Sequence, residues 1–255
     1  MRNLRSAVPS DPSTLAGPPL PPHELIPTMH IISLSFDDGI MPSAIRTAEI
    51  YERFGLRACL NVLAAPEALI PAQLEWGADR GDWVLWNQLE ARGHEIMPHG
   101  YNHANKADIP LEQAKASVLR CLDIFDRKLD GFRRDQAVFN FPHNASTPEL
   151  ESWLSTQVRA FRTAGGGINP LPYRGMIKLT TTGSGPENCE EHLDREIDAL
   201  LSQPAGWLIY NTHALDDQGW GPIRASYLES LLPRLLAIET VRVLPTAAAL
   251  AEAYS

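Results

Sequence analysis

Residues 31–39 have the sequence IISLSFDDG, in which an apolar run ends abruptly in two carboxylates. A short apolar segment bounded by a turn signal predicts a buried strand, and Gly39 permits a sharp turn after it. Asp37 and Asp38 then lie beyond the strand, where they have no core to fill. They form either an ordinary Asp-Asp-Gly turn or part of a site, in which one aspartate binds a metal and the other is a general base.

A histidine pair follows a second predicted strand. Residues 99–103 have the sequence HGYNH and come directly after the short apolar segment 95–97. The spacing of His99 and His103 brings two imidazoles within reach of one ion on a single turn, although Pro98 and Gly100 favour a tight loop. The alternative is a pair of solvated or hydrogen-bonded histidines. Together with one aspartate, the pair makes a sound ligand set for zinc or a similar divalent ion.

A third polar strand end is formed by residues 207–213, with the sequence WLIYNTH. A histidine in this position suits a general acid that protonates a leaving group, and a structural role is the alternative for His213. Asp216 and Asp217 follow closely in the sequence. Either of them orients His213 or simply caps the next turn.

Residues 140–144, with the sequence NFPHN, end one more predicted strand. The backbone N–H after Pro142 is a candidate hydrogen-bond donor to an oxyanion. His143 is an extra metal ligand, a substrate contact or a surface residue. We prefer a place in the wall of the substrate pocket. Pro142, His143 and Asn144 are therefore candidates for substrate or oxyanion contacts.

The pattern along the chain alternates short apolar segments with amphipathic ones. Strands are predicted over residues 31–36, 57–62, 95–97, 137–141, 158–163, 207–212 and 241–244. Helices are predicted over 43–54, 83–92, 111–129, 147–156, 190–202 and 226–238, and from 246 to the end. This alternation indicates a mainly parallel sheet, open or closed into a barrel. Since sites in such folds gather at the carboxyl ends of strands, the polar fragments lie where a site is expected.

Composition limits the function further. The 255 residues are 44% hydrophobic and carry 22 basic and 31 acidic side chains, a formal charge of −9 without a basic run. Nucleic acid is therefore a poor partner. Residues 1–28 form a Pro-rich lead segment and residues 29–255 a single catalytic domain. Three distant cysteines suggest a reducing compartment. No secretory signal or membrane span is evident, so we expect a cytoplasmic protein without membrane contacts.

Taken together, the fragments resemble the polysaccharide deacetylase family, the NodB-homology domains of carbohydrate esterase family 4. The family opens with Thr/Ser-Phe-Asp-Asp-Gly, which stands here at residues 35–39. Its His-x-x-x-His motif stands at residues 99–103, and its late Leu-x-His motif is similar to residues 211–213. The resemblance covers residues 31–250. Motifs in the right order on successive predicted strands are far more specific than any single one.

The resemblance implies an α/β fold, a distorted (β/α) barrel of seven strands, and a divalent metal. Zinc is the expected ion, with Co²⁺, Ni²⁺ or Mn²⁺ as alternatives. By resemblance Asp38, His99 and His103 are the ligands, Asp37 is the catalytic base and His213 the catalytic acid. The reaction would be hydrolysis of an N- or O-acetyl group on a sugar or glycan, with metal-bound water as the nucleophile and the backbone N–H of His143 at the oxyanion.

Two departures from the family pattern stand out. The third motif is usually Arg-x-Pro-Tyr, and the matching residues 140–143 lack the arginine that pairs with the base. The Asp-rich fourth motif, which supports the catalytic histidine, is not evident, and Asp216 or Asp217 is a candidate substitute. Trp220 lies in the loop after them and either stacks on a sugar ring or anchors that loop.

Three functions are compatible with these residues. The first is a metal-dependent deacetylase that acts on an acetylated carbohydrate. The second keeps the chemistry but cleaves a small amide that is not a carbohydrate, as in allantoinase-like branches that resemble this fold. The third is a non-catalytic binding module that retains the metal. The missing arginine motivates the third function, whereas the presence of Asp37 and His213 opposes it.

Overall fold

The computed structural model of this chain describes residues 29–69 and 79–253. The predicted Pro-rich lead segment lies outside this part. Eight strands and seven α-helices alternate along the described residues. The helices are α1 (Met41–Arg53), α2 (Trp83–Ala91), α3 (Leu111–Lys128), α4 (Pro148–Leu154), α5 (Glu190–Leu201), α6 (Ala225–Leu236) and α7 (Thr246–Glu252). None of these helices is both long enough and apolar enough to cross a membrane.

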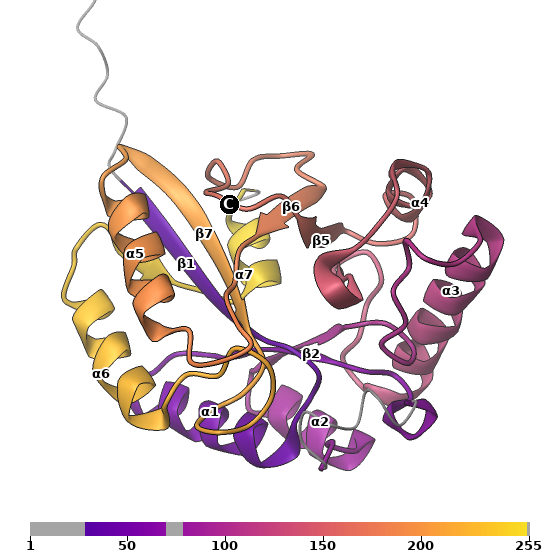
Figure 1. Cartoon of the computed structure of the whole chain (residues 1–255), viewed down its shortest axis with the longest axis horizontal. Helices are drawn as coiled ribbons and strands as arrows, with labels where there is room; N and C mark the ends of the chain where they lie inside the picture. Colours follow the sequence, from indigo (N-terminus) through magenta and orange to yellow (C-terminus); the bar gives the residue numbers. More distant parts are fainter. Residues whose placement is uncertain (1–28, 70–78, 254–255) are drawn as a thin grey trace, which may run out of the picture.

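The strands form two parallel sheets. The larger contains β1 (Met29–Phe36), β2 (Cys59–Val62), β3 (Glu95–Pro98), β7 (Ala205–Thr212) and β8 (Val241–Val243). The smaller contains β4 (Val138–Asn140), β5 (Ala160–Ala164) and β6 (Lys178–Thr181). A single bridge between Thr182 and Tyr210 links the end of β6 to β7. In Figure 1, β1 and β7 lie side by side, with α5 and α6 on one side of the molecule and α3 and α4 on the other.

This architecture confirms the predicted α/β fold and adds detail to the barrel. No ladder joins β3 to β4 within residues 29–69 and 79–253, so the barrel is open between the two sheets. The strand count is eight rather than the predicted seven, because β6 was not predicted. Its sequence, KLTT, contains one apolar residue, and a four-residue strand of this kind has no hydrophobic pattern by which to recognise it.

β1 is the central strand of the larger sheet. Its burial explains why residues 31–36 are mostly apolar. Every described residue from His30 to Phe36 is at most 3% exposed, as expected for a parallel strand that is covered on both faces. Its polar Ser33 is satisfied, since its hydroxyl donates to the carbonyl of Leu244 and accepts from the indole N–H of Trp207. β1 pairs with β7 along its whole length, with Phe36 opposite Thr212. This register places Asp37 next to His213 at the carboxyl ends of the two strands.

α7 lies at the end of the larger sheet opposite to Asp37 and His213. Glu95 holds the start of this helix by hydrogen bonds. Its carboxyl group accepts hydrogen bonds from the Thr246 hydroxyl at 2.6 Å and from the backbone N–H groups of Ala247 and Ala248 at 2.8 and 3.2 Å. These are donors of the first turn of α7, which have no partner inside the helix. Glu95 therefore joins the start of β3 to the C-terminal helix.

We expect Glu95→Ala to lower the free energy of unfolding by about 1–3 kcal/mol, because it leaves the Thr246 hydroxyl and the first N–H groups of α7 without their acceptor. Urea denaturation followed by circular dichroism measures this loss. Glu112→Ala is the matched control, since the Glu112 side chain is 82% exposed and its ion pair with Lys115 contributes little. Equal stability of the two variants would contradict the assigned role of Glu95.

Candidate functional site

Asp38, His99 and His103 converge at the carboxyl end of the larger sheet. Nε2 of His99 and Nε2 of His103 lie 3.3 and 3.2 Å from Oδ1 of Asp38. One candidate ligand atom from each residue lies within 4.8 Å of the others. Asp38 and His103 adopt left-handed backbone conformations, with φ of 73° and 58°. Such conformations are costly for residues other than glycine and cluster at functional sites.

The three side chains fit a divalent metal ion. Neither Oδ1 of Asp38 nor Nε2 of His99 has a hydrogen-bond partner of acceptable geometry within the described ranges, although both atoms are buried. Nδ1–H of His99 donates to the carbonyl of Asn140 at 3.1 Å, which leaves the Nε2 lone pair for the site. This support of a ligating imidazole by a backbone carbonyl is typical of metal centres. One carboxylate and two imidazoles are ligands of zinc and of its neighbours in the first transition row.

The charges of these groups suit metal ligands. Burial lowers the pKa of His99, against the opposing effect of Asp37 and Asp38, and this favours the neutral imidazole. Burial would raise the pKa of Asp38, but His103 and His99 hold it well below its usual range. Arg80, which precedes α2, adds a cation whose Nη2 lies 3.9 Å from Oδ2 of Asp38. Arg80 was not predicted, because only the tertiary structure brings residues 79–81 against residues 39–41.

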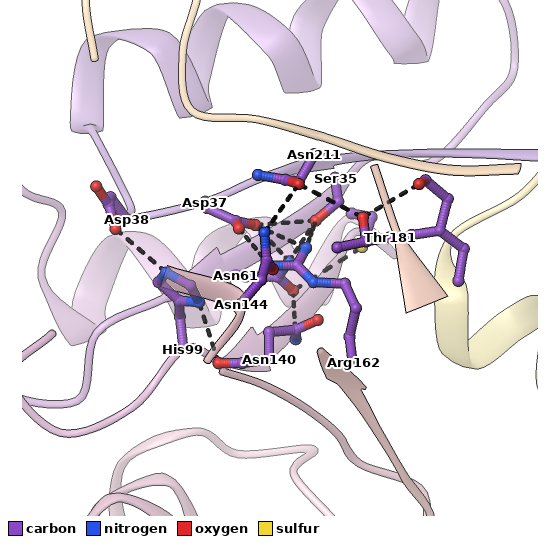
Figure 2. Close-up of polar contacts among 12 residues, drawn as sticks. Ser35, Asp37, Asp38, Asn61, His99, Asn140, Asn144, Arg162, Thr181 and Asn211 are labelled. Atoms are coloured by element: carbon purple, nitrogen blue, oxygen red, sulfur yellow. Dashed lines mark hydrogen bonds and ion pairs between the residues drawn. The ribbon is translucent and has the colours of Figure 1, made fainter. Parts of the chain in front are cut away.

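Asp37 lines the same pocket as this trio of side chains, and its carboxylate belongs to a buried polar network. Its Oδ1 accepts from the Ser35 hydroxyl at 2.9 Å and from Nδ2 of Asn61 at 2.7 Å. Arg162 of β5 binds both carboxylate oxygens, with Nη1 3.1 Å from Oδ1 and Nη2 on Oδ2. Asn140 of β4 completes the network through its Nδ2, 2.9 Å from Oδ1 of Asn61 (Figure 2). Four strands thus meet around one carboxylate.

The expectation that Asp37 lacks an arginine partner was wrong. The arginine is present, but it comes from β5 and not from the segment that ends β4, where Asn140 stands. Burial would raise the pKa of Asp37, but the guanidinium of Arg162 holds it well below its usual range, with smaller contributions from His99 and His213. Arg162 is fully buried. A charged residue inside the apolar strand predicted over residues 158–163 was the sequence signal that could have revealed it.

His213 lines the pocket beside Trp220. The two ring centroids are 5.5 Å apart and the rings are nearly perpendicular. Trp220 packs closely on Gly185, where a Cβ atom would come within 2.5 Å of the indole ring. Nδ1 of His213 is buried and has no hydrogen-bond partner in the described part of the chain.

The structure does not place Asp216 or Asp217 on this nitrogen. Both residues are exposed, and Oδ1 of Asp216 accepts the N–H of Ala225 at the start of α6, at 3.0 Å. Asp216 therefore has the capping role that was the alternative to orienting His213. Both aspartates line a separate surface depression with Arg46 and Gln218.

The short segment after β4 forms the opposite wall of the pocket. Pro142 is buried against Gly100, where an added Cβ atom would lie 2.9 Å from the proline ring. The His143 ring lies 4.5 Å from that of His103, and its Nε2 donates to the carbonyl of His103 at 3.2 Å. Nδ2 of Asn144 donates to Oδ1 of Asn211 at 3.4 Å. This segment therefore connects the candidate ligands to β7.

These side chains enclose one pocket of about 350 Å³. It is lined by Asp37, Asp38, His99, His103, His143, Asn144, Asn211, His213 and Trp220. All the predicted catalytic, metal and pocket-wall residues except Pro142, Asp216 and Asp217 are in this set. A volume of this size suits a small ligand, and the arrangement supplies an ionised carboxylate, a ligand trio and a histidine around one space.

No protein-family model matches the sequence, and no curated protein sequence does. Several solved structures are similar in fold. A family 4 acetyl xylan esterase from Clostridium thermocellum, in complex with a cobalt ion, has a TM-score of 0.58 and 15% identity, over 87% of this chain and 91% of the esterase. The peptidoglycan deacetylase PdaC from Bacillus subtilis has a TM-score of 0.56 and 15% identity, over 89% and 93%. An allantoinase has a TM-score of 0.63 and 12% identity, over 95% and 97%.

The likeness covers most of each compared chain. It confirms the fold that the resemblance of the sequence motifs implied. The chain has the parallel α/β fold that is shared by the NodB-homology carbohydrate esterases and allantoinase.

We expect His103→Ala and Asp38→Asn each to weaken Zn²⁺ binding by more than about 100-fold, because each removes a candidate direct ligand. Loss of a residue that only supports a ligand already costs roughly 10- to 100-fold. Competition with a chromophoric chelator measures the affinity. His192→Ala, on α5 and outside the pocket, is the control and should bind Zn²⁺ normally. Unchanged affinity in both ligand variants would show that the metal binds elsewhere.

We expect Arg162→Leu to lower the free energy of unfolding by about 3–5 kcal/mol at pH 7, because it leaves the buried carboxylate of Asp37 unpaired. The pKa of Asp37 is depressed in the folded protein, so the stability from this pair is present above the ordinary aspartate pKa of about 3.9 and is lost as the pH falls.

The stability gap between wild type and Arg162→Leu should therefore narrow between about pH 5 and pH 2. Urea denaturation at a series of pH values measures the gap. Arg242→Leu removes an exposed ion pair with Glu252 and should cost less than about 1 kcal/mol at every pH. A gap that widens on acidification would contradict the assigned ion pair.

Proposed function

We propose that this protein is a metal-dependent hydrolase that removes an acyl group of about the size of acetyl from a carbohydrate amine or hydroxyl. The observation that carries the proposal is the position of Asp37. It is an ionised carboxylate that is oriented by Arg162, adjacent in sequence to one candidate ligand and next to His213 across the β1–β7 register.

Asp38, His99 and His103 would hold the metal, for which Zn²⁺ is the first choice and Co²⁺, Ni²⁺ or Mn²⁺ are alternatives. A metal ion bound there would supply Lewis acidity, which polarises a carbonyl and lowers the pKa of water. Asp37 accepts a proton from the attacking water, because its carboxylate lines the pocket and stays ionised. His213 donates a proton to the departing nitrogen or oxygen. The backbone N–H of His143 is the proposed donor to the carbonyl oxygen.

Three features favour a carbohydrate as the leaving group. The compared esterase and peptidoglycan deacetylase act on acylated polymers according to their names. Trp220 lies beside His213, where its indole offers a flat surface to a sugar ring. The pocket is large enough for an acyl group and part of one ring.

A cytoplasmic location stays a prediction from the sequence.

A second candidate function is hydrolysis of a small amide that is not a carbohydrate. Two observations favour it: the likeness to an allantoinase extends over 95% of this chain, and every residue that lines the pocket except Trp220 carries a charged or hydrogen-bonding side chain. The non-catalytic alternative loses its main support, because Arg162 supplies the partner of Asp37 that was thought to be missing.

We expect metal-stripped protein to release acetate from a panel of N- and O-acetylated sugars only after Zn²⁺ or Co²⁺ is added. Asp37→Asn should abolish turnover while it retains metal, and His213→Ala should lower kcat by about 10²- to 10⁴-fold, the usual contribution of a general acid. Enzymatic determination of acetate gives the rate, and metal analysis gives the occupancy.

Allantoin belongs in the same panel, with loss of the substrate as its readout. Metal-dependent cleavage of allantoin without any acetate release would favour the second candidate function. Full activity of Asp37→Asn would remove this residue as the base. His192→Ala again serves as the control, because His192 contacts Tyr210 outside the pocket.

A further inference from the structure

The deepest part of the pocket is polar. Asp37, Asp38, His99 and Asn211 are its most buried lining residues, each at most 7% exposed. No aliphatic side chain lines this pocket within residues 29–69 and 79–253. Trp220, the one large apolar surface, lies beside His213. A ligand group that reaches the floor therefore meets hydrogen-bonding atoms.

Asn211 is held in one orientation at this floor. Its Oδ1 accepts from Nδ2 of Asn144 at 3.4 Å. The hydroxyl of Thr181 lies 3.5 Å from the same oxygen but donates to the carbonyl of Ile209, which is closer at 3.1 Å. Gly183 packs behind it, since a Cβ atom there would come within 2.9 Å of the same oxygen. The Nδ2 group donates to no other described residue, and Figure 2 shows this nitrogen pointing away from Thr181, on the side of Asp37. It is a fixed donor without an acceptor.

An acceptor without a donor lies next to it. Oδ1 of Asn144 is buried and has no hydrogen-bond partner in the described part of the chain. The two amides are already joined through their other atoms. The pair therefore combines one unused donor, on a residue that lines the pocket, and one unused acceptor that is fully buried.

The orientation of a substrate follows from the proposed function, on which this inference rests. The scissile carbonyl lies between the ligand trio and Asp37, and the leaving group lies toward His213 and Trp220, which are partly exposed at the rim. The remaining substituent of the carbonyl carbon then faces inward. Asn211, two residues before His213 on β7, is the residue that it meets.

We propose that the acyl group carries a hydrogen-bond acceptor next to its carbonyl carbon, the hydroxyl of a glycolyl group, in place of the methyl group of acetyl. Water adds its oxygen to the carbonyl carbon, the carbon–nitrogen bond breaks, and a proton passes to the amine. The products are the free amine and glycolic acid. A methyl group would leave the donor of Asn211 buried without an acceptor, which costs roughly 10- to 100-fold in kcat/KM.

N-glycolylglucosamine and N-acetylglucosamine are a matched pair of probes, because they differ only by one hydroxyl group. The measurement is kcat/KM for each compound with Zn²⁺-loaded wild type and Asn211→Leu. The glycolyl-to-acetyl ratio should fall by about 10- to 100-fold in the variant. Comparing ratios between proteins cancels the difference in intrinsic reactivity of the two carbonyl groups. Asn188→Leu, at an exposed position before α5, should leave the ratio unchanged.

An unchanged ratio in Asn211→Leu would overturn the inference even if both compounds are hydrolysed. If neither compound is hydrolysed although metal is bound, the proposed function fails, and binding then tests the inference separately. Ligand-observed NMR with metal-free wild type should show tighter binding of the glycolyl compound, and equal binding of both would overturn the inference. Should Asn211→Leu not fold, Asn144→Ala removes the hydrogen bond that orients the Asn211 amide and should lower the same ratio.

Discussion

The buried ion pair between Asp37 and Arg162 is the interaction around which the carboxyl end of the barrel is organised. Removing two charges from water is costly, and the pair is tolerable because both oxygens of Asp37 and both terminal nitrogens of Arg162 have hydrogen-bond partners. Ser35 and Asn61 provide such partners from β1 and β2, and Asn140 of β4 donates to Asn61 in turn. The strands of both sheets must therefore meet in one arrangement, although no backbone ladder joins β3 to β4.

The position of Asp37 also constrains the candidate metal ligands. Adjacent residues of a strand point to opposite sides, so an inward Asp37 would send Asp38 away from the pocket. The left-handed conformation of Asp38, with φ of 73°, removes this conflict and directs its carboxylate to His99 and His103. Gly39, with φ of 68°, continues the turn under Trp86. The strain at the end of β1 is thus what allows two neighbouring carboxylates to serve one pocket.

The polar character of the interior extends beyond the ion pair to the floor of the pocket. Asn211 of β7 and Asn144 after β4 meet there, and Thr181 of β6 lies next to Asn211. A buried amide is acceptable in a folded protein only when its donors and acceptors are used. The unused donor of Asn211 belongs to a residue that lines the same pocket as the candidate base, the candidate acid and the three candidate ligands, and a polar substrate group is the partner that we propose for it.

The sequence by itself determined the order of strands and helices, the parallel α/β class and the fragments that form the site. These features depend on local patterns, namely apolar runs, turn residues and the spacing of His99 and His103. The short strand β6 was missed because four residues with one apolar side chain leave no such pattern.

Only the tertiary structure decided that Arg162 pairs with Asp37, since the two residues are 125 positions apart and the arginine comes from an unexpected strand. The same holds for Asp216, which caps α6 instead of supporting His213, and for the contact of Asn144 with Asn211. Each of these depends on which strands and loops become neighbours, and this is set by packing over the whole chain.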